Sequence, residues 1–253
     1  MGAIAGDTTG FSHDRCYLSS TGNCGTQITK EHFISRNILE RLAKPKLKIN
    51  APHFFGKPSV EIGVDSFSAK VLCDKHNSAL SKLDDVAGVA FGLIEELSAR
   101  LATISNEPGA GKSFYVSSGI DIERWMIKVF CGLVAAGKIR GISGLHVSVS
   151  DLWAGQLDSL LGRSTLPEPL GMYTHTFVGQ QRTPGSFSFS TIQLTDGSGE
   201  VGGVMLSLGL MSLVLVTSPR FSVTFTEPNW YRHPGLLFNV KHGGSRAAYL
   251  LTY

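Results

Sequence analysis

The sequence predicts an α+β protein: a small N-terminal module rich in potential metal ligands, then long helices, then a C-terminal antiparallel β-rich domain. Three of the four cysteines and one histidine form two close pairs in the first third of the chain, separated by a long insert. Between residues 78 and 139, apolar residues recur at the spacing of amphipathic helices. From residue 170 onward, apolar and polar residues alternate between turn sequences such as DGSG and HPG, which is the pattern of strands joined by tight turns.

The length and composition suit one large domain or two small ones, because 42% of the 253 residues are hydrophobic. Pro108, Gly109 and Gly111 interrupt the helical pattern after the first long helix. We therefore expect a module over residues 1–103 and an accessory α+β domain over residues 104–253, in which two helices precede an antiparallel sheet.

The two ligand pairs have the spacings Cys-x7-Cys and Cys-x2-His, and they consist of Cys16, Cys24, Cys73 and His76. Three thiols and an imidazole in two close pairs suit a tetrahedral structural Zn²⁺, and the second spacing is typical of zinc knuckles. The fourth cysteine, Cys131, lies in an apolar helical stretch and is expected to be a small core residue.

A Glu31–His32 pair lies between the ligand pairs, and Asn77 directly follows the second one. An acid, an imidazole and an amide of this kind can supply a hard-metal ligand, a general base and a second ligand for phosphodiester hydrolysis. These groups are far apart in sequence, so the chemistry requires the zinc ligands to bring them together.

Three stretches together carry a family resemblance: CYLSSTGNC, ITKEHFIS and VLCDKHNSALSKLDD. Residues 16–85 resemble the HNH nuclease module, the ββα-metal fold, in its zinc-knuckle variant. The resemblance implies that His32 ends a β-strand and activates water, while Glu31 and Asn77 hold a catalytic Mg²⁺ or Mn²⁺. It implies an endonuclease that hydrolyses phosphodiester bonds in nucleic acid, with DNA as the expected substrate.

The elements around this motif follow from local patterns. GTQIT and KEHFI predict a short strand pair ending at His32, SRNILERLA predicts a brief helix, and KPKLKINAPHFFGKPS predicts a loop. A long amphipathic helix follows the DKHN turn, and on it Asp84 lies two turns after Asn77, on the same face. Asp84 is therefore a further candidate to complete the ion site or to orient His32, although a surface acid near Lys82 is the simpler interpretation.

Basic residues are concentrated near the proposed base, since residues 1–58 contain eight Lys or Arg against four acids. The net charge of +3 is too small to predict nucleic-acid binding by itself. We expect the local group to contact a phosphate backbone, although a solvated helix face and loop would explain it equally well on charge alone. The group consists of Lys30, Arg36, Arg41, Lys44, Lys46 and Lys48.

Two other functions remain open. A zinc-stabilised module that binds nucleic acid or protein without cutting would use the same ligands. A P-loop nucleotide-binding protein would use NEPGAGKS, residues 106–113, with Lys112 on the phosphates. That loop needs a strand before it and a helix after it, whereas the sequence predicts a helix before and a strand after.

The chain is expected to lie in the reducing cytoplasm and to have no membrane partner. Its first residues show no basic region before an apolar run, as a signal peptide would. Residues 201–219 are uncharged and long enough to span a bilayer, but glycines, serines and β-branched residues favour two buried strands joined by a tight bend.

Overall fold

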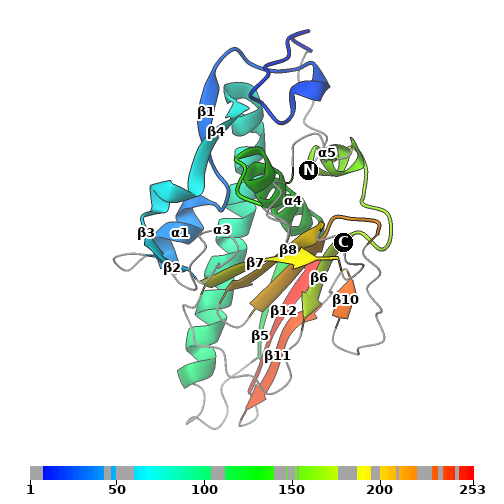
Figure 1. The fold of residues 1–253 in the computed structure, drawn as a ribbon. Helices are drawn as coiled ribbons and strands as arrows, with labels where there is room; N and C mark the ends of the chain where they lie inside the picture. Colours follow the sequence, from blue (N-terminus) through cyan, green and yellow to red (C-terminus); the bar gives the residue numbers. More distant parts are fainter. Residues whose placement is uncertain are drawn as a thin grey trace.

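The protein has a mixed α/β fold, shown in Figure 1 as a computed structural model. The structure describes residues 8–42, 47–49, 60–103, 112–139, 147, 152, 154–175, 187–194, 200–208, 211–220, 230–232, 236–242 and 245–253.

The N-terminal part is built on two antiparallel strands followed by a helix. Strand β1 (Ile28–His32) pairs with β4 (Ser68–Cys73), and α3 (Asp74–Thr103) begins at the next residue. The predicted local strand pair is therefore wrong: GTQIT and KEHFI contribute one strand, whose partner comes from beyond the long insert. The turn between them that a hairpin needs does not form, because β1 runs unbroken through Thr29 and Lys30 with only a shift in register.

The segment between β1 and β4 folds beside them. Helix α1 (Arg36–Leu42) confirms the predicted brief helix, and it packs so closely on α3 that a Cβ added at Gly88 would collide with Asn37. Strands β2 (Leu47–Ile49) and β3 (Val60–Ile62) pair with each other, and the short helix η2 (Val64–Phe67) leads into β4. The predicted loop thus contains the short strand β2, and its other residues, 44–46 and 50–59, lie outside the described residues.

Helix α3 runs most of the length of the molecule and packs against α4 (Gly119–Ala135) (Figure 1). Ser118 caps α4 by accepting a hydrogen bond from the backbone N–H of Asp121 at 3.2 Å. Gly137 has φ of 63° just after the helix, the left-handed conformation in which glycine commonly ends a helix. Helix α5 (Ala154–Leu160) is the second of the two helices expected before the sheet.

The C-terminal strands form the predicted antiparallel sheet, in the order β10-β6-β9-β8-β7. Its strands are β6 (Gly171–His175), β7 (Phe187–Gln193), β8 (Val201–Leu208), β9 (Met211–Val216) and β10 (Trp230–Arg232). The uncharged stretch 201–219 forms β8 and β9, which pair antiparallel, so the two-strand interpretation is confirmed. Among the described residues, no helix is long and apolar enough to span a bilayer.

A second sheet contains a pairing that the sequence pattern did not predict. Strand β12 (Ser245–Thr252) pairs antiparallel with β11 (Leu236–His242) and parallel with β5 (Lys112–Ser118). Lys112 therefore begins a strand, and the preceding helix α3 ends at Thr103, which is the order that argues against a P-loop. The loop itself, residues 104–111, lies outside the described residues.

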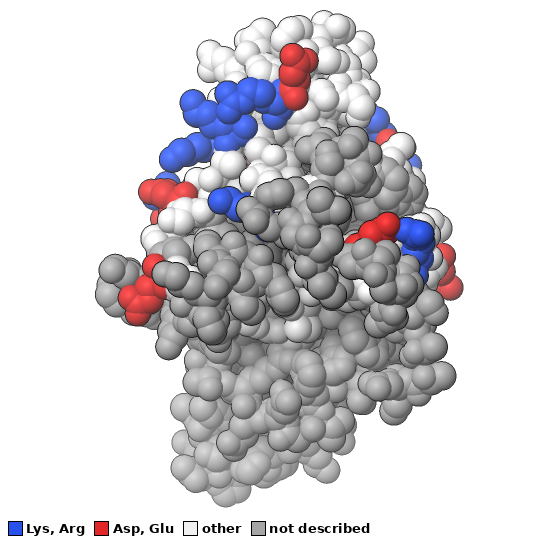
Figure 2. Space-filling model, in the orientation of Figure 1, with Lys and Arg blue, Asp and Glu red and all other residues white. Residues whose placement is uncertain are grey.

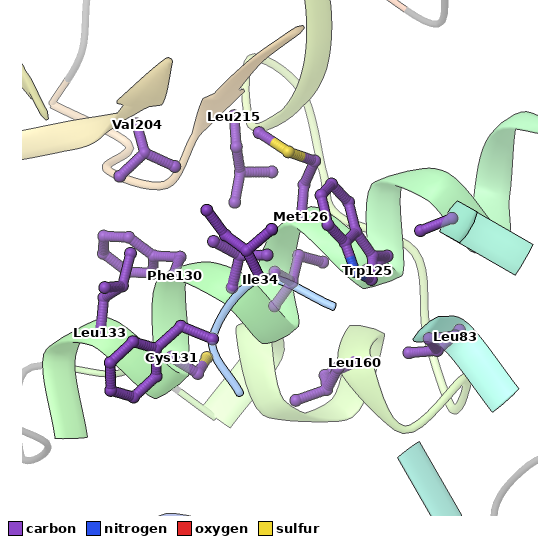
Figure 3. Close-up of a cluster of buried hydrophobic side chains, with 14 of the residues drawn as sticks. Ile34, Leu83, Trp125, Met126, Phe130, Cys131, Leu133, Leu160, Val204 and Leu215 are labelled. Atoms are coloured by element: carbon purple, nitrogen blue, oxygen red, sulfur yellow. The ribbon is translucent and has the colours of Figure 1, made fainter. Parts of the chain in front are cut away.

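One hydrophobic cluster includes residues from both predicted domains. Figure 3 shows Trp125, Met126 and Phe130 of α4 in this cluster, together with Ile34 of the N-terminal part and Leu215 of the five-stranded sheet. Trp125 is 0% exposed and lies edge-on to Phe91 of α3, with the ring centroids 5.4 Å apart. Helix α4 thus supplies a buried surface on which the sheet and the ββα unit, formed by β1, β4 and α3, both pack. The domain boundary predicted after residue 103 stays a prediction.

Candidate metal centre and active site

The four predicted zinc ligands meet in a buried cluster. The ligand atoms of Cys16, Cys24, Cys73 and His76 all lie within 4.8 Å of one another. Nδ1 of His76 lies 3.1 Å from the sulfur of Cys73, 3.4 Å from that of Cys16 and 3.8 Å from that of Cys24. Tetrahedral zinc with ordinary bond lengths separates sulfur and nitrogen ligands by about 3.5 Å, so these residues fit the ion.

The surroundings of the cluster favour metal binding. The backbone N–H groups of Gly25 and His76 point at the sulfur of Cys73 at 3.3 and 3.4 Å, and such bonds stabilise a thiolate. Nε2 of His76 lies 3.2 Å from the hydroxyl of Thr21, which leaves Nδ1 for the ion. Burial raises the pKa of the Cys16 thiol to about 12, so at neutral pH that thiol deprotonates only with a nearby cation.

The cluster joins segments that are distant in sequence. Cys16 and Cys24 flank the short helix η1 (Ser19–Thr21), Cys73 ends β4, and His76 lies in the first turn of α3. Gly25 passes so close to Asp74 that a Cβ there would collide with the carboxylate. The close approach explains why the segment entering β1 carries glycine at this point.

His32 lies at the end of β1, as expected, with its side chain 19% exposed. Its Nε2 is 3.6 Å from an oxygen of Asp65, a residue of η2 that the sequence pattern did not single out. Burial lowers the pKa of His32 below its ordinary value, Arg36 acts in the same direction, and Asp65 acts against them. The imidazole is therefore neutral at pH 7, the form in which it accepts a proton.

Asn77 is held against the same strand. Its amide nitrogen donates to the hydroxyl of Thr29 at 2.9 Å and to the backbone oxygen of Lys30 at 3.1 Å. Both bonds come from Nδ2, so Oδ1 is the atom that remains for a cation. The structure thus brings Asn77 to β1, two residues before His32.

The carboxylates of Glu31 and Asp84 both face Lys128 of α4. The ammonium of Lys128 pairs with the carboxylate of Glu31 and lies 2.8 Å from both carboxylate oxygens of Asp84. Burial raises the pKa of Glu31 to about 7, and Lys128 acts against that shift. Burial also lowers the pKa of Lys128, but the two carboxylates more than offset this, so that pKa lies above its ordinary value.

Two more residues complete this network, and the sequence pattern missed their role. The hydroxyl of Ser35 donates to Asp84 at 2.5 Å and accepts from the indole N–H of Trp125 at 2.8 Å. Ser35 is 1% exposed, so both bonds are shielded from water. Lys128 lies between Ile127 and Val129 in the apolar half of α4, and a charged residue in such a stretch is the signal from which a buried partner was predictable.

Basic side chains gather over β1 and β4 in Figure 2, in the upper part of the molecule. Lys30 is exposed and lies directly opposite Lys70, also exposed, in the register of the two strands. Like charges in this position repel each other, and a bound anion would relieve the repulsion. Lys70 is therefore a candidate phosphate contact that the sequence analysis missed.

The other members of the predicted basic group are less completely described. Arg36 pairs with Glu40 at 2.7 Å and Arg41 with Glu95 at 3.6 Å, both on the surface, where such pairs are weak. Lys48 lies in β2, and its side chain is outside the described part of the chain, as are Lys44 and Lys46 entirely.

Comparison of the chain with models of known protein families, with curated proteins and with solved structures gave no match.

Proposed function

We propose that the protein is an HNH-type endonuclease that hydrolyses phosphodiester bonds in nucleic acid, with a structural Zn²⁺ on Cys16, Cys24, Cys73 and His76. One observation carries the proposal: β1 pairs with β4, α3 begins directly after β4, and the buried ligand cluster joins this ββα unit to the segment before β1, with a neutral histidine at the end of the first strand. Zinc at that cluster would hold the start of α3 against the segment before β1.

His32 is the general base of the proposed mechanism. Its lowered pKa keeps the imidazole neutral at working pH, and Asp65 beside Nε2 favours the tautomer in which Nδ1 is free to take a proton from the attacking water. The proton moves from water to His32, and the resulting hydroxide attacks phosphorus as the leaving oxygen departs.

A Mg²⁺ or Mn²⁺ ion is part of the proposal, with Oδ1 of Asn77 as its best-supported ligand. When bound, such an ion neutralises the charge that develops on the phosphate. Glu31 and Asp84, the other expected ligands, have their carboxylates on Lys128.

Binding of the substrate falls to the basic surface of the ββα unit. Lys30 and Lys70 form its centre, and Arg36 and Arg41 extend it along α1. Contacts of this kind recognise the phosphate backbone and carry no sequence information, so we propose DNA cleavage with weak sequence preference.

The second candidate is a zinc-stabilised binding module that no longer cuts. The ion pair between Glu31 and Lys128 favours it, because that pair neutralises an acid expected to hold the catalytic ion. Zinc content and binding to nucleic acid would be the same for both candidates, so only cleavage separates them.

The test is incubation of plasmid DNA with the zinc-loaded protein over a range of Mg²⁺ and Mn²⁺ concentrations, followed as nicking and linearisation. His32→Ala should lower the rate by about a hundred- to ten-thousand-fold, because that is the typical contribution of a general base. The matched control is His13→Ala, because His13 contacts Cys16 through its backbone oxygen, which the change keeps, and it lies outside β1.

Zinc content and DNA affinity should be unchanged in both variants, which would show that His32 acts in the chemical step. Undiminished cleavage by His32→Ala would refute the assigned base. Absence of cleavage of any DNA or RNA form with either ion would favour the binding module.

A further inference from the structure

Lys128 is a fully buried cation at the junction of three elements. It belongs to α4, its side chain is 1% exposed, and it contacts Glu31 of β1 and Asp84 of α3. Its ammonium also lies 3.5 Å from the backbone oxygen of His32. A buried lysine is rare and costly unless it is paired, so its partners must be held in place for the fold to persist.

The same geometry argues against Glu31 as a ligand of the catalytic ion. Its side chain is 4% exposed, and its carboxylate already faces the ammonium. Mg²⁺ keeps several of its water molecules when it binds to proteins, and a carboxylate so buried leaves no room for them. Successive side chains on a strand point to opposite faces, so Glu31 turns inward where His32 turns outward.

We infer that Glu31 is the counter-ion of Lys128 and not a metal ligand, and that the Glu31–Lys128–Asp84 cluster positions the strand end that carries His32. This inference rests on the proposed function for its effect on cleavage. Lys128 and Glu31 act as positioning residues, since neither contacts the reacting atoms. Ser35, hydrogen-bonded to Asp84 and Trp125, fixes the third member of the cluster.

The cluster restrains His32 because His32 is the chain neighbour of Glu31. Glu31 is the residue before His32, so anchoring its carboxylate on α4 limits how far the end of β1 can rotate. The hydrogen bond from Lys128 to the His32 carbonyl limits it further. Loss of the anchor should leave the basic surface and Asn77 in place, because both are held by the pairing of β1 with β4 and by contacts of Thr29 and Lys30.

The experiment uses a double variant, Glu31→Gln with Lys128→Met, in the full zinc-loaded chain. Removing both charges avoids the buried, unpaired Glu31 carboxylate that Lys128→Met alone would leave. Asp84 keeps its hydrogen bond from Ser35 and is 24% exposed to water, so the double variant should fold. Mn²⁺ affinity is measured by electron paramagnetic resonance, cleavage as kcat and KM, and the His32 ring signals by NMR. Asn77→Ala is the comparison for a lost ligand, and Asp85→Asn is the control for removal of an exposed acid.

The double variant should bind Mn²⁺ within about twofold of the natural protein, whereas Asn77→Ala should bind it about tenfold or more weakly, the usual loss when a metal site is damaged. Its kcat should fall about tenfold or more with KM unchanged, the mark of lost positioning in the transition state. The His32 ring signals should shift in the double variant and not in Asp85→Asn.

Mn²⁺ binding weakened as much as in Asn77→Ala would overturn the inference, because Glu31 would then be a ligand. A double variant with unchanged kcat or unchanged His32 ring signals would also overturn the inference, because the cluster would then pack in the core without positioning His32. If the natural protein cleaves no nucleic acid, the proposed function fails by itself, and the Mn²⁺ and NMR comparisons still decide the role of Glu31.

Discussion

Replacing Cys73 with serine should cost the protein its zinc and most of the stability of the ββα unit. The sulfur of Cys73 lies 3.1 Å from Nδ1 of His76 and accepts N–H groups from Gly25 and His76, so the change removes a ligand and two hydrogen bonds. Structural zinc contributes ~10–16 kcal/mol in isolated zinc-finger peptides. A whole domain is stable by only ~5–15 kcal/mol. Loss of the ion is therefore sufficient to unfold the segments that it joins.

The assay measures zinc by elemental analysis of chelator-washed protein and unfolding by circular dichroism. The natural chain should retain one Zn²⁺ per molecule, and Cys73→Ser should retain none and unfold at a much lower temperature. Cys131→Ser is the matched control, because Cys131 is 0% exposed but lies in α4 outside the cluster. It buries one hydroxyl and should lose ~1–3 kcal/mol while it keeps its zinc.

Two results would refute this reasoning. One is folded natural protein without zinc after chelator washing, since the cluster would then be held by packing alone. The other is Cys73→Ser with full zinc content and a stability equal to that of Cys131→Ser, since the sulfur would then contribute no more than a buried core thiol.

Lys30→Ala and Lys70→Ala should each weaken DNA binding uniformly across sequences and lower the salt dependence of log K by about one unit, as measured by fluorescence anisotropy at several salt concentrations. Cleavage should be independent of pH above the ordinary His32 pKa of 6.5 and fall as the pH drops through its lowered pKa, because protonation removes the base. A profile of kcat/KM against pH measures this, and a midpoint above that ordinary value would contradict the role of burial. Gly25→Ala should destabilise the protein by ~1–3 kcal/mol in urea unfolding, because the methyl group collides with Asp74.

Three variants serve as controls for these predictions. Lys82→Ala removes an exposed lysine of α3 and should leave the salt dependence unchanged if binding is local to β1 and β4. Gly63→Ala adds a methyl group where nothing lies within 4 Å, at φ of −76°, and should be nearly neutral. The pH profile of Asp65→Asn should fall at a lower pH than that of the natural protein, because Asp65 raises the pKa of His32.

Local patterns predicted the helices well and the pairing of strands poorly. Helix α4 and its glycine cap follow from apolar spacing and from Gly137, both of which act within a few residues. The partner of β1 lies beyond the long insert, and β5 pairs with β12 from the opposite end of the chain. Such pairings depend on which buried faces meet, which no local pattern records.

The same distinction between local pattern and long-range packing applies to the residues of the candidate site. The sequence by itself identified the four residues of the buried ligand cluster, because thiol and imidazole groups in two close pairs are the donor set that a tetrahedral metal site needs. It also determined the chemistry of His32 and Asn77, because residue type sets what each group can donate or accept. The partner of Glu31 was decided only by the tertiary structure: it is the ammonium of Lys128, which lies 97 positions further along the chain. Burial removes water from that carboxylate and makes its nearest charge dominate, and only the packing of α4 against β1 determines which charge is nearest.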